Sequence, residues 1–411
     1  MPTPPSYRST VSALAVGQIV CWAALYYAFS SFVLPMQRAL GWSKPELMGA
    51  FTVGLAMWGA ASYAVGAAID RGRGRKVMTL GAALAGVGFG LWSTVDNLPM
   101  LYLTWALLGV SMAMTLYEPA FNVLTKRFPD RYVRGITTLT LVGGFASTLS
   151  FPAAAWLMAW CGWRDALAVI GVVLLLVIAP LHAWALRGTP EHAVPPRAAD
   201  ARADSTLHEA LRERAFWLLA ASFTLYWFAA AAMWAHLMPA FAAKGRSEAQ
   251  ALAVVVWFGP AQVLGRLLHF AFGRAIAPRT LGLVVLGGLP VSLAIFALAD
   301  RTAALLVFAL LFGFANGLVT IVRGSLLPDY FGRQHVGRIS GAMASIALLA
   351  RAAAPLMTAW LLVALPGYRE LLLGLSAVGV ASLIAFALAE RPLRGAAPAS
   401  SGRSRASSES A

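Results

Sequence analysis

About twelve apolar runs, most of them close to 20 residues long, constrain the fold of this chain more than any other feature. An α-helix of about 20 apolar residues is long enough to cross the hydrocarbon core of a bilayer. We therefore predict an all-α polytopic membrane protein with twelve transmembrane helices. The runs occupy approximately residues 10–36, 46–69, 77–95, 98–124, 135–159, 163–186, 215–241, 249–273, 280–299, 302–326, 339–363 and 368–389.

Composition excludes most other classes of protein. Of the 411 residues 59% are hydrophobic and only 12% are charged, which leaves too little polar surface for a soluble protein. The basic residues behind the formal net charge of +15 lie mainly in short loops. They therefore indicate which loops are cytoplasmic, and they do not indicate a surface that binds nucleic acid. Cys21 and Cys161 are isolated, and no metal cluster, nucleotide-binding loop or catalytic triad stands out. We expect no enzyme activity, no cofactor or metal, and no nucleic-acid partner.

The segment between the second and third apolar runs carries one acid and four basic residues, from Gly66 to Lys76. So much charge cannot lie in hydrocarbon, and short basic loops mark the cytoplasmic side of a membrane. Most of the 32 Lys and Arg residues fall on the same side as this loop. We therefore expect both termini in the cytoplasm, a first helix that is retained and not cleaved as a signal peptide, and a location in a bacterial inner membrane.

This loop resembles the signature between helices 2 and 3 of major facilitator superfamily transporters, written G-x-x-x-D-R-x-G-R-[RK]. The chain has one residue more than the pattern before its Gly-Arg-Lys, so Arg73 and Arg75 are both candidates for the inward-facing arginine of the family. The resemblance implies a gating motif that consists of Gly66, Asp70, Arg71, Gly74, Arg75 and Lys76.

The resemblance also implies two pseudo-symmetric six-helix bundles of the major facilitator fold, with the solute bound between them near mid-membrane. We expect an N-terminal bundle over 1–186, a polar cytoplasmic linker over 187–214, a C-terminal bundle over 215–389 and a disordered cytoplasmic tail over 390–411. A short helix is expected at 207–214, within the linker. Matches at an offset of 204 support a duplication, and they pair Pro35 with Pro239, Gly41 with Gly245, Ser43 with Ser247, Gly109 with Gly313 and Arg134 with Arg338.

In the family the acid of this loop holds one conformation by lying near the N-terminal end of helix 11, where the helix dipole favours a negative charge. Carried over, Asp70 is expected near the start of the 339–363 run. Arg71 or Arg75 is expected near Glu118 or the loop between the fourth and fifth helices. Loss of these contacts would let the two halves rock.

Glu118 is the one acid clearly inside an apolar run. An ionisable group at that depth usually faces a cavity or a partner. Two interpretations are open: a coupling site that binds and releases a proton as access alternates, or a structural ion pair with the loop between helices 2 and 3.

Three cations, Arg266, Arg323 and Arg351, also lie inside apolar runs. Three embedded cations against one acid leave the interior positive, which favours an anionic solute because guanidinium holds a carboxylate through two hydrogen bonds. The alternative for Arg323 and Arg351 is that they neutralise helix ends or Glu118. Further candidates for substrate binding are the polar side chains Tyr26, Tyr27, Tyr117, Asn122 and Asn316.

A narrower resemblance covers helices 4, 5 and 8. Tyr117-Glu118-Pro119, followed by Lys126-Arg127, is similar to the bacterial branch related to monocarboxylate transporters. The substrate-contacting arginine of helix 8 in that branch matches Arg266 by position. Its companion acid is missing here, since Gln262 stands where a partner is expected.

These observations predict a monomeric secondary active transporter that moves a small organic solute, an organic anion in the first place, by alternating access through a lipid bilayer. Coupling to protons through Glu118 is the favoured mechanism, and symport and antiport both remain open. The alternatives are an efflux carrier for drugs or arsenicals, a vitamin uptake carrier of the riboflavin kind and, from another class, a membrane sensor that does not transport.

Overall fold

The computed structural model describes residues 5–188, 204–273 and 276–390, which form helices joined by short loops, with no strand in these three ranges. Residues 189–203 of the expected linker and 391–411 of the expected tail lie outside the described residues. The expected short helix before the second bundle is present as α10 (Leu207–Arg212), and a capping box at Thr206 begins it.

Ten helical stretches of the described chain are long and apolar enough to cross a membrane. Two of the ten contain a reversal. Arg71 and Gly72 leave helical geometry inside Pro45–Ser93, and Gly162 does so inside Thr148–Ala185. Each of these two stretches therefore contains a turn, and division of the described chain at both turns gives as many helical segments as there are apolar runs.

The first six crossings run in chain order. They are α1 (Tyr7–Trp22), which continues through a π-helical stretch at Ala23–Tyr27 into α2 (Ala28–Leu40); α3 (Lys44–Ala68); α4 (Gly74–Ser93); α5 (Leu98–Thr115) with α6 (Tyr117–Arg127); α7 (Tyr132–Gly143) with the first part of α8 (Ala146–Val173); and the rest of α8, which continues through Leu174–Ile178 into α9 (Ala179–Ala185).

The last six crossings follow α10. They are α11 (Arg214–Ala243); α12 (Glu248–Val255) with α13 (Phe258–Phe272); α14 (Pro278–Leu298); α15 (Thr302–Phe331); α16 (Val336–Ala364); and α17 (Tyr368–Leu388). The fourth and tenth crossings extend several residues beyond the apolar runs that predict them, as far as Arg127 and Phe331.

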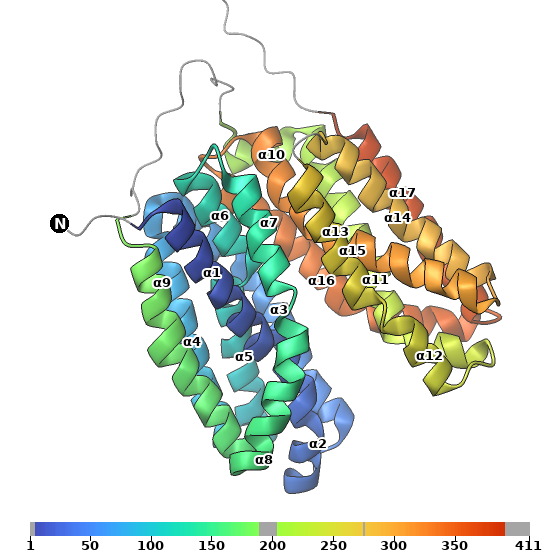
Figure 1. Ribbon diagram of the computed structural model, residues 1–411, viewed down its shortest axis with the longest axis horizontal. Helices are drawn as coiled ribbons and strands as arrows, with labels where there is room; N and C mark the ends of the chain where they lie inside the picture. The colour runs from blue at the N-terminus through green and yellow to red at the C-terminus, as the bar shows by residue number, and fades with distance from the viewer. Residues whose placement is uncertain (1–4, 189–203, 274–275, 391–411) are drawn as a thin grey trace, which may run out of the picture.

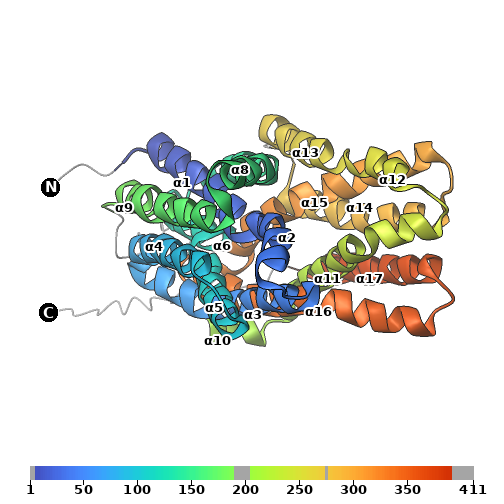
Figure 2. The same ribbon diagram turned by 90° about the horizontal axis from the view of Figure 1, so that it is seen from below.

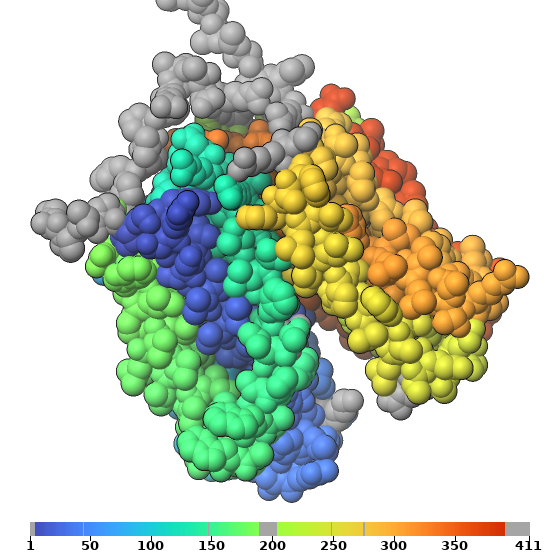
Figure 3. All heavy atoms as spheres, in the orientation of Figure 1, coloured from blue at the N-terminus to red at the C-terminus, as the bar shows by residue number. Residues whose placement is uncertain are grey.

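The two sets of six crossings form two bundles that meet at one end and separate at the other (Figure 1). We call the end that carries α10 and the Gly66–Lys76 loop the closed end, and the end that carries α2 and α12 the open end. The view from the open end shows the bundles side by side (Figure 2), and the space-filling view shows a wide notch between them at that end (Figure 3).

The packing of buried residues explains this shape. One hydrophobic cluster joins the closed end of the first bundle, with residues such as Leu14, Val123 and Ile136, to the core of the second bundle. A second cluster fills the open half of the first bundle, around Trp92 and Trp105, and includes Ala344 and Leu348 of α16. The bundles therefore share apolar packing at the closed end, where burial of apolar surface stabilises their contact.

The two open-end turns that follow the first and seventh crossings have the same local geometry. Gly41 and Gly245 both adopt positive φ, at +72° and +71°, which a glycine accepts without steric cost. Ser43 and Ser247 then each begin the next helix with a capping box. The matched turns give structural support to the repeat at an offset of 204.

Candidate substrate site and closed-end contacts

The Gly66–Lys76 loop is a tight reversal at the closed end. Gly72 adopts φ +79°, the left-handed conformation that turns the chain between α3 and α4. Gly66 lies where α3 crosses α16, and a Cβ there would overlap the carbonyl oxygen of Gly337. Gly74 packs against the side chain of Val123 on α6. These glycines therefore allow close approach of helices on both sides of the loop.

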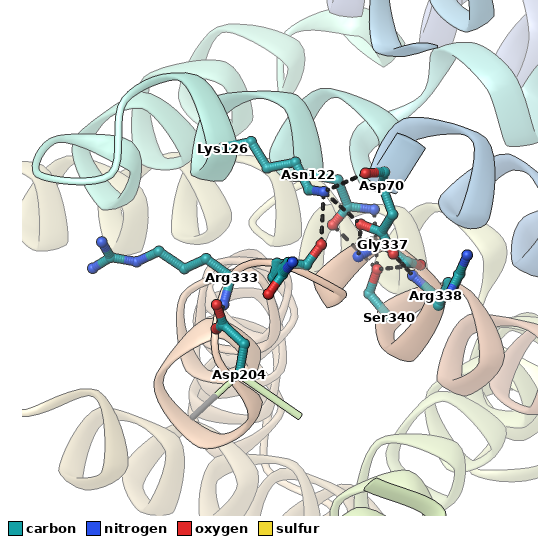
Figure 4. Close-up of polar contacts among 9 residues, drawn as sticks. Asp70, Asn122, Lys126, Asp204, Arg333, Gly337, Arg338 and Ser340 are labelled. Carbon is teal, nitrogen blue, oxygen red and sulfur yellow. Dashed lines mark hydrogen bonds and ion pairs between the residues drawn. The ribbon is translucent and has the colours of Figure 1, made fainter. Parts of the chain in front are cut away.

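Asp70 bridges the two bundles from this loop (Figure 4). Its carboxylate accepts hydrogen bonds from the backbone N–H of Gly337 at 3.0 Å and of Arg338 at 2.7 Å. Both donors belong to the first turn of α16, where N–H groups lack intrahelical partners and the helix dipole favours an anion. The side chain of Asp70 is only 2% exposed. Asp70 thus lies at the start of helix 11, where the family resemblance locates it.

Lys126, near the end of α6, supplies the positive charge beside Asp70. Its Nζ is 2.9 Å from Asp70 Oδ1, and it donates to the carbonyl oxygen of Gln334 in the second bundle at 2.8 Å. On the second bundle, the backbone N–H of Arg333 donates to Asp204 Oδ1 at 2.6 Å, as Figure 4 also shows. The loop between α15 and α16 is therefore held both by the first bundle and by the segment that precedes α10.

The other basic residues of the loop lie elsewhere than expected. Arg71 and Lys76 are exposed, and the exposed Arg75 donates from Nε to the carbonyl oxygen of Ala183 near the end of α9, at 2.9 Å. We expected Arg71 or Arg75 near Glu118 or the loop between the fourth and fifth helices. Instead Arg75 bonds to α9, and Glu118 bonds to Arg323. The physical reason is that Arg75 lies on the side of α4 that faces α9, where helix carbonyls attract a cation.

The fourth crossing is broken in its middle, between α5 and α6, because Leu116 has an extended backbone. Pro119 explains the break: it has no N–H to bond to the carbonyl of Thr115, and its ring would clash with that carbonyl in a continuous helix. The side-chain amide of Gln18 compensates, since it donates to the carbonyl oxygens of Thr115 at 2.8 Å and of Leu116 at 3.3 Å.

Glu118 lies in the first turn of α6, just after this break. Its Oε1 accepts from Arg323 Nη1 of α15 at 2.7 Å, and Arg323 Nη2 donates to the carbonyl oxygen of Ser340 at 3.2 Å. One turn further along α6, the amide of Asn122 bonds to the hydroxyl of Ser340 at 3.0 Å. Glu118 therefore pairs across the bundles with Arg323, and the alternative of an ion pair with the Gly66–Lys76 loop is wrong.

Arg266 lies on α13 and is only 6% exposed. Its Nε donates to the carbonyl oxygen of Gly317 on α15 at 3.0 Å. Its guanidinium also lies against Gly144 of the first bundle, where a Cβ would overlap Nη1. Glycine at position 144 therefore makes room for this arginine between the bundles.

Arg351 lies midway along α16 and also faces the first bundle. Its Nη2 donates to the Tyr26 hydroxyl at 2.6 Å, and its guanidinium lies 5.4 Å from the centre of the Tyr26 ring and 5.2 Å from that of Trp227 on α11. Arg351 therefore lies between aromatic side chains of the two bundles.

The ion pairs among the described residues are Lys126–Asp70, Lys244–Asp300 and Arg323–Glu118. Within that part of the chain, neither Arg266 nor Arg351 has a carboxylate partner. Of the three embedded cations that the sequence singles out, Arg323 thus neutralises Glu118, whereas Arg266 and Arg351 lie between the bundles without an acid.

A cluster of aromatic side chains lies beside Arg351. The Trp22 ring is near the rings of Tyr26, Tyr27 and Tyr117, with centres 5.4, 6.3 and 4.9 Å away. Trp22 Nε1 has no hydrogen-bond partner in the described ranges. The structure thus brings Tyr26, Tyr27 and Tyr117 together at the first-bundle side of the site.

Asn316 of α15 is half-buried, and its Oδ1 has no hydrogen-bond partner in the described parts of the chain. Asn122, the other asparagine that the sequence singles out, bonds to Ser340 and so belongs to the closed-end contacts. Both cysteines, the buried Cys21 and the half-buried Cys161, are free thiols. No group of three potential metal ligands lies together within the described residues.

A cavity of about 470 Å³ opens between the first two crossings next to the tyrosines. Its lining includes Tyr26 and Tyr27 together with Phe29, Phe51 and Val33. The sequence does not reveal this cavity, because it depends on how α2 packs against α3. Gln18 and Ser340 are likewise missed by sequence reasoning, although Pro119 is a sequence signal for the break that Gln18 supports.

Fold and site together define a multi-pass membrane protein whose two helical bundles enclose a positively charged, aromatic site. The family model of the Major Facilitator Superfamily matches residues 14–299, more than half of the chain, and the chain belongs to this family. The structure is similar to the crystal structure of the human organic anion transporter MFSD10, with a TM-score of 0.70 and 17% sequence identity over 93% of this chain and 100% of that one.

Two curated relatives carry names of carboxylate carriers. Monocarboxylate transporter 11 of Mus musculus is 30% identical over 189 residues, which cover 43% of this chain and 42% of that protein. The oxalate:formate antiporter of Oxalobacter formigenes is 25% identical over 212 residues, which cover 51% of this chain and 50% of the antiporter. The chain thus spans about half or less of the length of these relatives.

Proposed function

We propose that this protein is a secondary active transporter that moves a small organic anion by alternating access, with the carboxylate bound by Arg266 and Arg351. The observation that carries the proposal is that these two guanidinium groups lie between the bundles with no acid partner among the described residues. A desolvated cation without a partner is costly. A carboxylate ligand removes that cost and accepts paired hydrogen bonds from guanidinium.

The names of the relatives support this substrate class, because both describe carriers of carboxylic acids. The surroundings of the arginines support it as well. Arg351 lies between Tyr26 of the first bundle and Trp227 of the second, so a ligand bound there contacts both halves. A ligand that contacts both halves can favour one arrangement of the bundles over another.

In this proposal the closed-end contacts form the gate of one conformation. Asp70, Lys126, Glu118 and Asn122 of the first bundle hold the second bundle, and all four contacts must break before the closed end opens. We place the closed end in the cytoplasm, as the basic Gly66–Lys76 loop indicates. The conformation described here is then open to the outside. A reporter fused after Leu388 and active only in the cytoplasm tests this orientation, and activity of a periplasm-specific reporter there would contradict it.

We further propose a monomer in a bacterial inner membrane, with Glu118 as the site that couples transport to protons. Protonation of Glu118 would remove the charge that holds Arg323, so proton binding and opening of the closed end would favour one another. In this proposal the Glu118–Arg323 pair both holds the closed end and couples transport to protons, whereas Arg266 and Arg351 bind the anion.

Thermal stability of the purified protein tests the substrate class. A ligand at 100 times its dissociation constant stabilises the folded state by about 2.7 kcal/mol, so a panel of carboxylates should contain compounds that raise the melting temperature of the wild type. Arg266→Gln and Arg351→Gln should each abolish that increase. The matched control is Arg279→Gln, which removes a half-buried arginine that donates to the carbonyl oxygen of Ala387 outside the site.

Control and wild type should respond alike to the same compounds. If the two site variants also respond like wild type, or if only uncharged compounds raise the melting temperature, the anion proposal is wrong.

A further inference from the structure

The cavity next to the site arginines has an unusual lining for a carrier of small acids. Its volume of about 470 Å³ is within the range of sites that hold drug-sized ligands, about 300 to 1,000 Å³. None of its lining residues is charged. Its side walls are aromatic and aliphatic, and they include Phe29, Phe51 and Val33.

These walls are built from rings that support each other. The rings of Phe29 and Phe51 stack with centres 4.8 Å apart and an angle of 17° between their planes. Tyr26 meets Phe51 edge to face at 5.8 Å, and Phe29 packs in the same way on the buried Trp105 at 4.6 Å. The wall is therefore pre-formed by packing within the first bundle, and little side-chain ordering remains to oppose ligand binding.

One residue, Tyr26, belongs both to the cavity and to the charged site. Tyr26 lines the cavity, and its hydroxyl accepts the hydrogen bond from Arg351. A ligand whose carboxylate lies at Arg351 therefore has an uncharged, largely apolar space beside it. An acid of two or three carbons would leave most of that space to water, whereas a larger apolar group would gain about 0.8 kcal/mol for each methylene it buries.

We infer that the transported anion is an amphipathic carboxylate, with its charged group at Arg351 and an apolar, ring-sized body in the cavity between α2 and α3. This inference rests on the proposed function, because it assigns the apolar part of a ligand whose carboxylate the arginines hold. It separates this protein from carriers whose substrates are dicarboxylates or short acids of only a few carbons.

A series of acids of increasing size tests the inference. The dissociation constant of each acid is measured on the purified protein. Acetate, butyrate, benzoate and 3-phenylpropionate differ in apolar area, and oxalate and 3-phenylpropionamide complete the set. Each additional buried methylene should tighten binding about three- to fourfold, so 3-phenylpropionate should bind far more tightly than acetate or oxalate. The uncharged amide should bind much more weakly than its acid.

A cavity-filling variant gives the second measurement. Ser30 lines the cavity from an exposed position, so Ser30→Phe fills the space without overpacking the core. Ser30→Phe should weaken 3-phenylpropionate binding at least tenfold and leave acetate binding unchanged. The control Ser30→Ala, which removes the hydroxyl group without filling the space, should bind both acids like wild type.

The outcomes separate the inference from the proposed function. Equal binding of acetate and 3-phenylpropionate, with no effect of Ser30→Phe, overturns the amphipathic substrate and leaves the anion carrier intact. If instead the amide binds as tightly as the acid and Arg351→Gln changes nothing, the proposed function itself fails.

Discussion

Glu118 and Arg323 show how one pair of residues can stabilise the contact between the two bundles at the closed end. The two side chains are 23% and 12% exposed and are joined at 2.7 Å, and they belong to different bundles. Breaking a largely buried ion pair by removing one partner is costly, because the remaining charge has lost its counter-ion. The pair therefore stabilises the closed end only while both charges are present, which is the property that a proton-controlled gate requires.

The variant Glu118→Gln tests the coupling role at this scale. In proteoliposomes, exchange of external for internal anion should continue, because the anion site at Arg266 and Arg351 is intact. Uptake driven by an imposed pH gradient should fall at least tenfold, because glutamine carries no proton between the two sides. Tracer uptake with and without the gradient measures both quantities.

Glu370→Gln is the control, since Glu370 lies in the first turn of α17 at the open end. It should keep both activities. If Glu118→Gln also keeps gradient-driven uptake, Glu118 is a structural partner of Arg323 and the coupling group lies elsewhere.

Among the elements, the broken fourth crossing does most to shape the site. Its two helices, α5 and α6, meet at Leu116, and the first turn of α6 carries Tyr117 toward the aromatic cluster and Glu118 toward Arg323. In lipid, a helix break is tolerated only where its freed backbone groups find partners. Gln18 of α1 provides that partner for two carbonyl oxygens and is fully buried there.

We predict that Gln18→Ala destabilises the protein through this break. Two buried carbonyl oxygens would lose their donor, at a cost of about 1 to 3 kcal/mol, and the melting temperature should fall accordingly. Ser111→Ala is the matched control on the same crossing. The Ser111 hydroxyl bonds to the Leu107 carbonyl of its own helix, so that carbonyl keeps its backbone partner. A fall in melting temperature equal to that of Ser111→Ala would mean that Gln18 does not support the break.

Particular elements also show what the sequence could predict. The apolar runs and the Gly66–Lys76 loop depend on local composition and spacing, so the twelve crossings and the family follow from them. The pairing of Glu118 with Arg323 joins residues 205 positions apart, and the sequence offered several partners for each. The break at Leu116 had a local signal in Pro119, but its support by Gln18 depends on how α1 packs against α5. The cavity beside Tyr26 depends on packing alone.

On the scale of the whole molecule, the two bundles share apolar packing at the closed end and separate toward the open end. Alternating access then requires that the closed-end contacts be made and broken in every transport cycle. Contacts within a bundle need not change. This difference allows a direct test of rocking with engineered disulfides, since Cys21 and Cys161 can first be replaced by alanine.

The cross-bundle pair Asn122→Cys with Ser340→Cys should form a disulfide on oxidation, because the native side chains are in hydrogen-bond contact at 3.0 Å. The disulfide fixes the closed end, so anion transport should stop and should return when a reductant breaks it. The pair Ser222→Cys with Ser382→Cys is the control, because these side chains approach within 3.4 Å inside the second bundle. Its disulfide should leave transport unchanged. The two pairs differ only in whether they join the bundles. If transport continues while positions 122 and 340 are cross-linked, the closed end need not open, and rocking about these contacts is refuted.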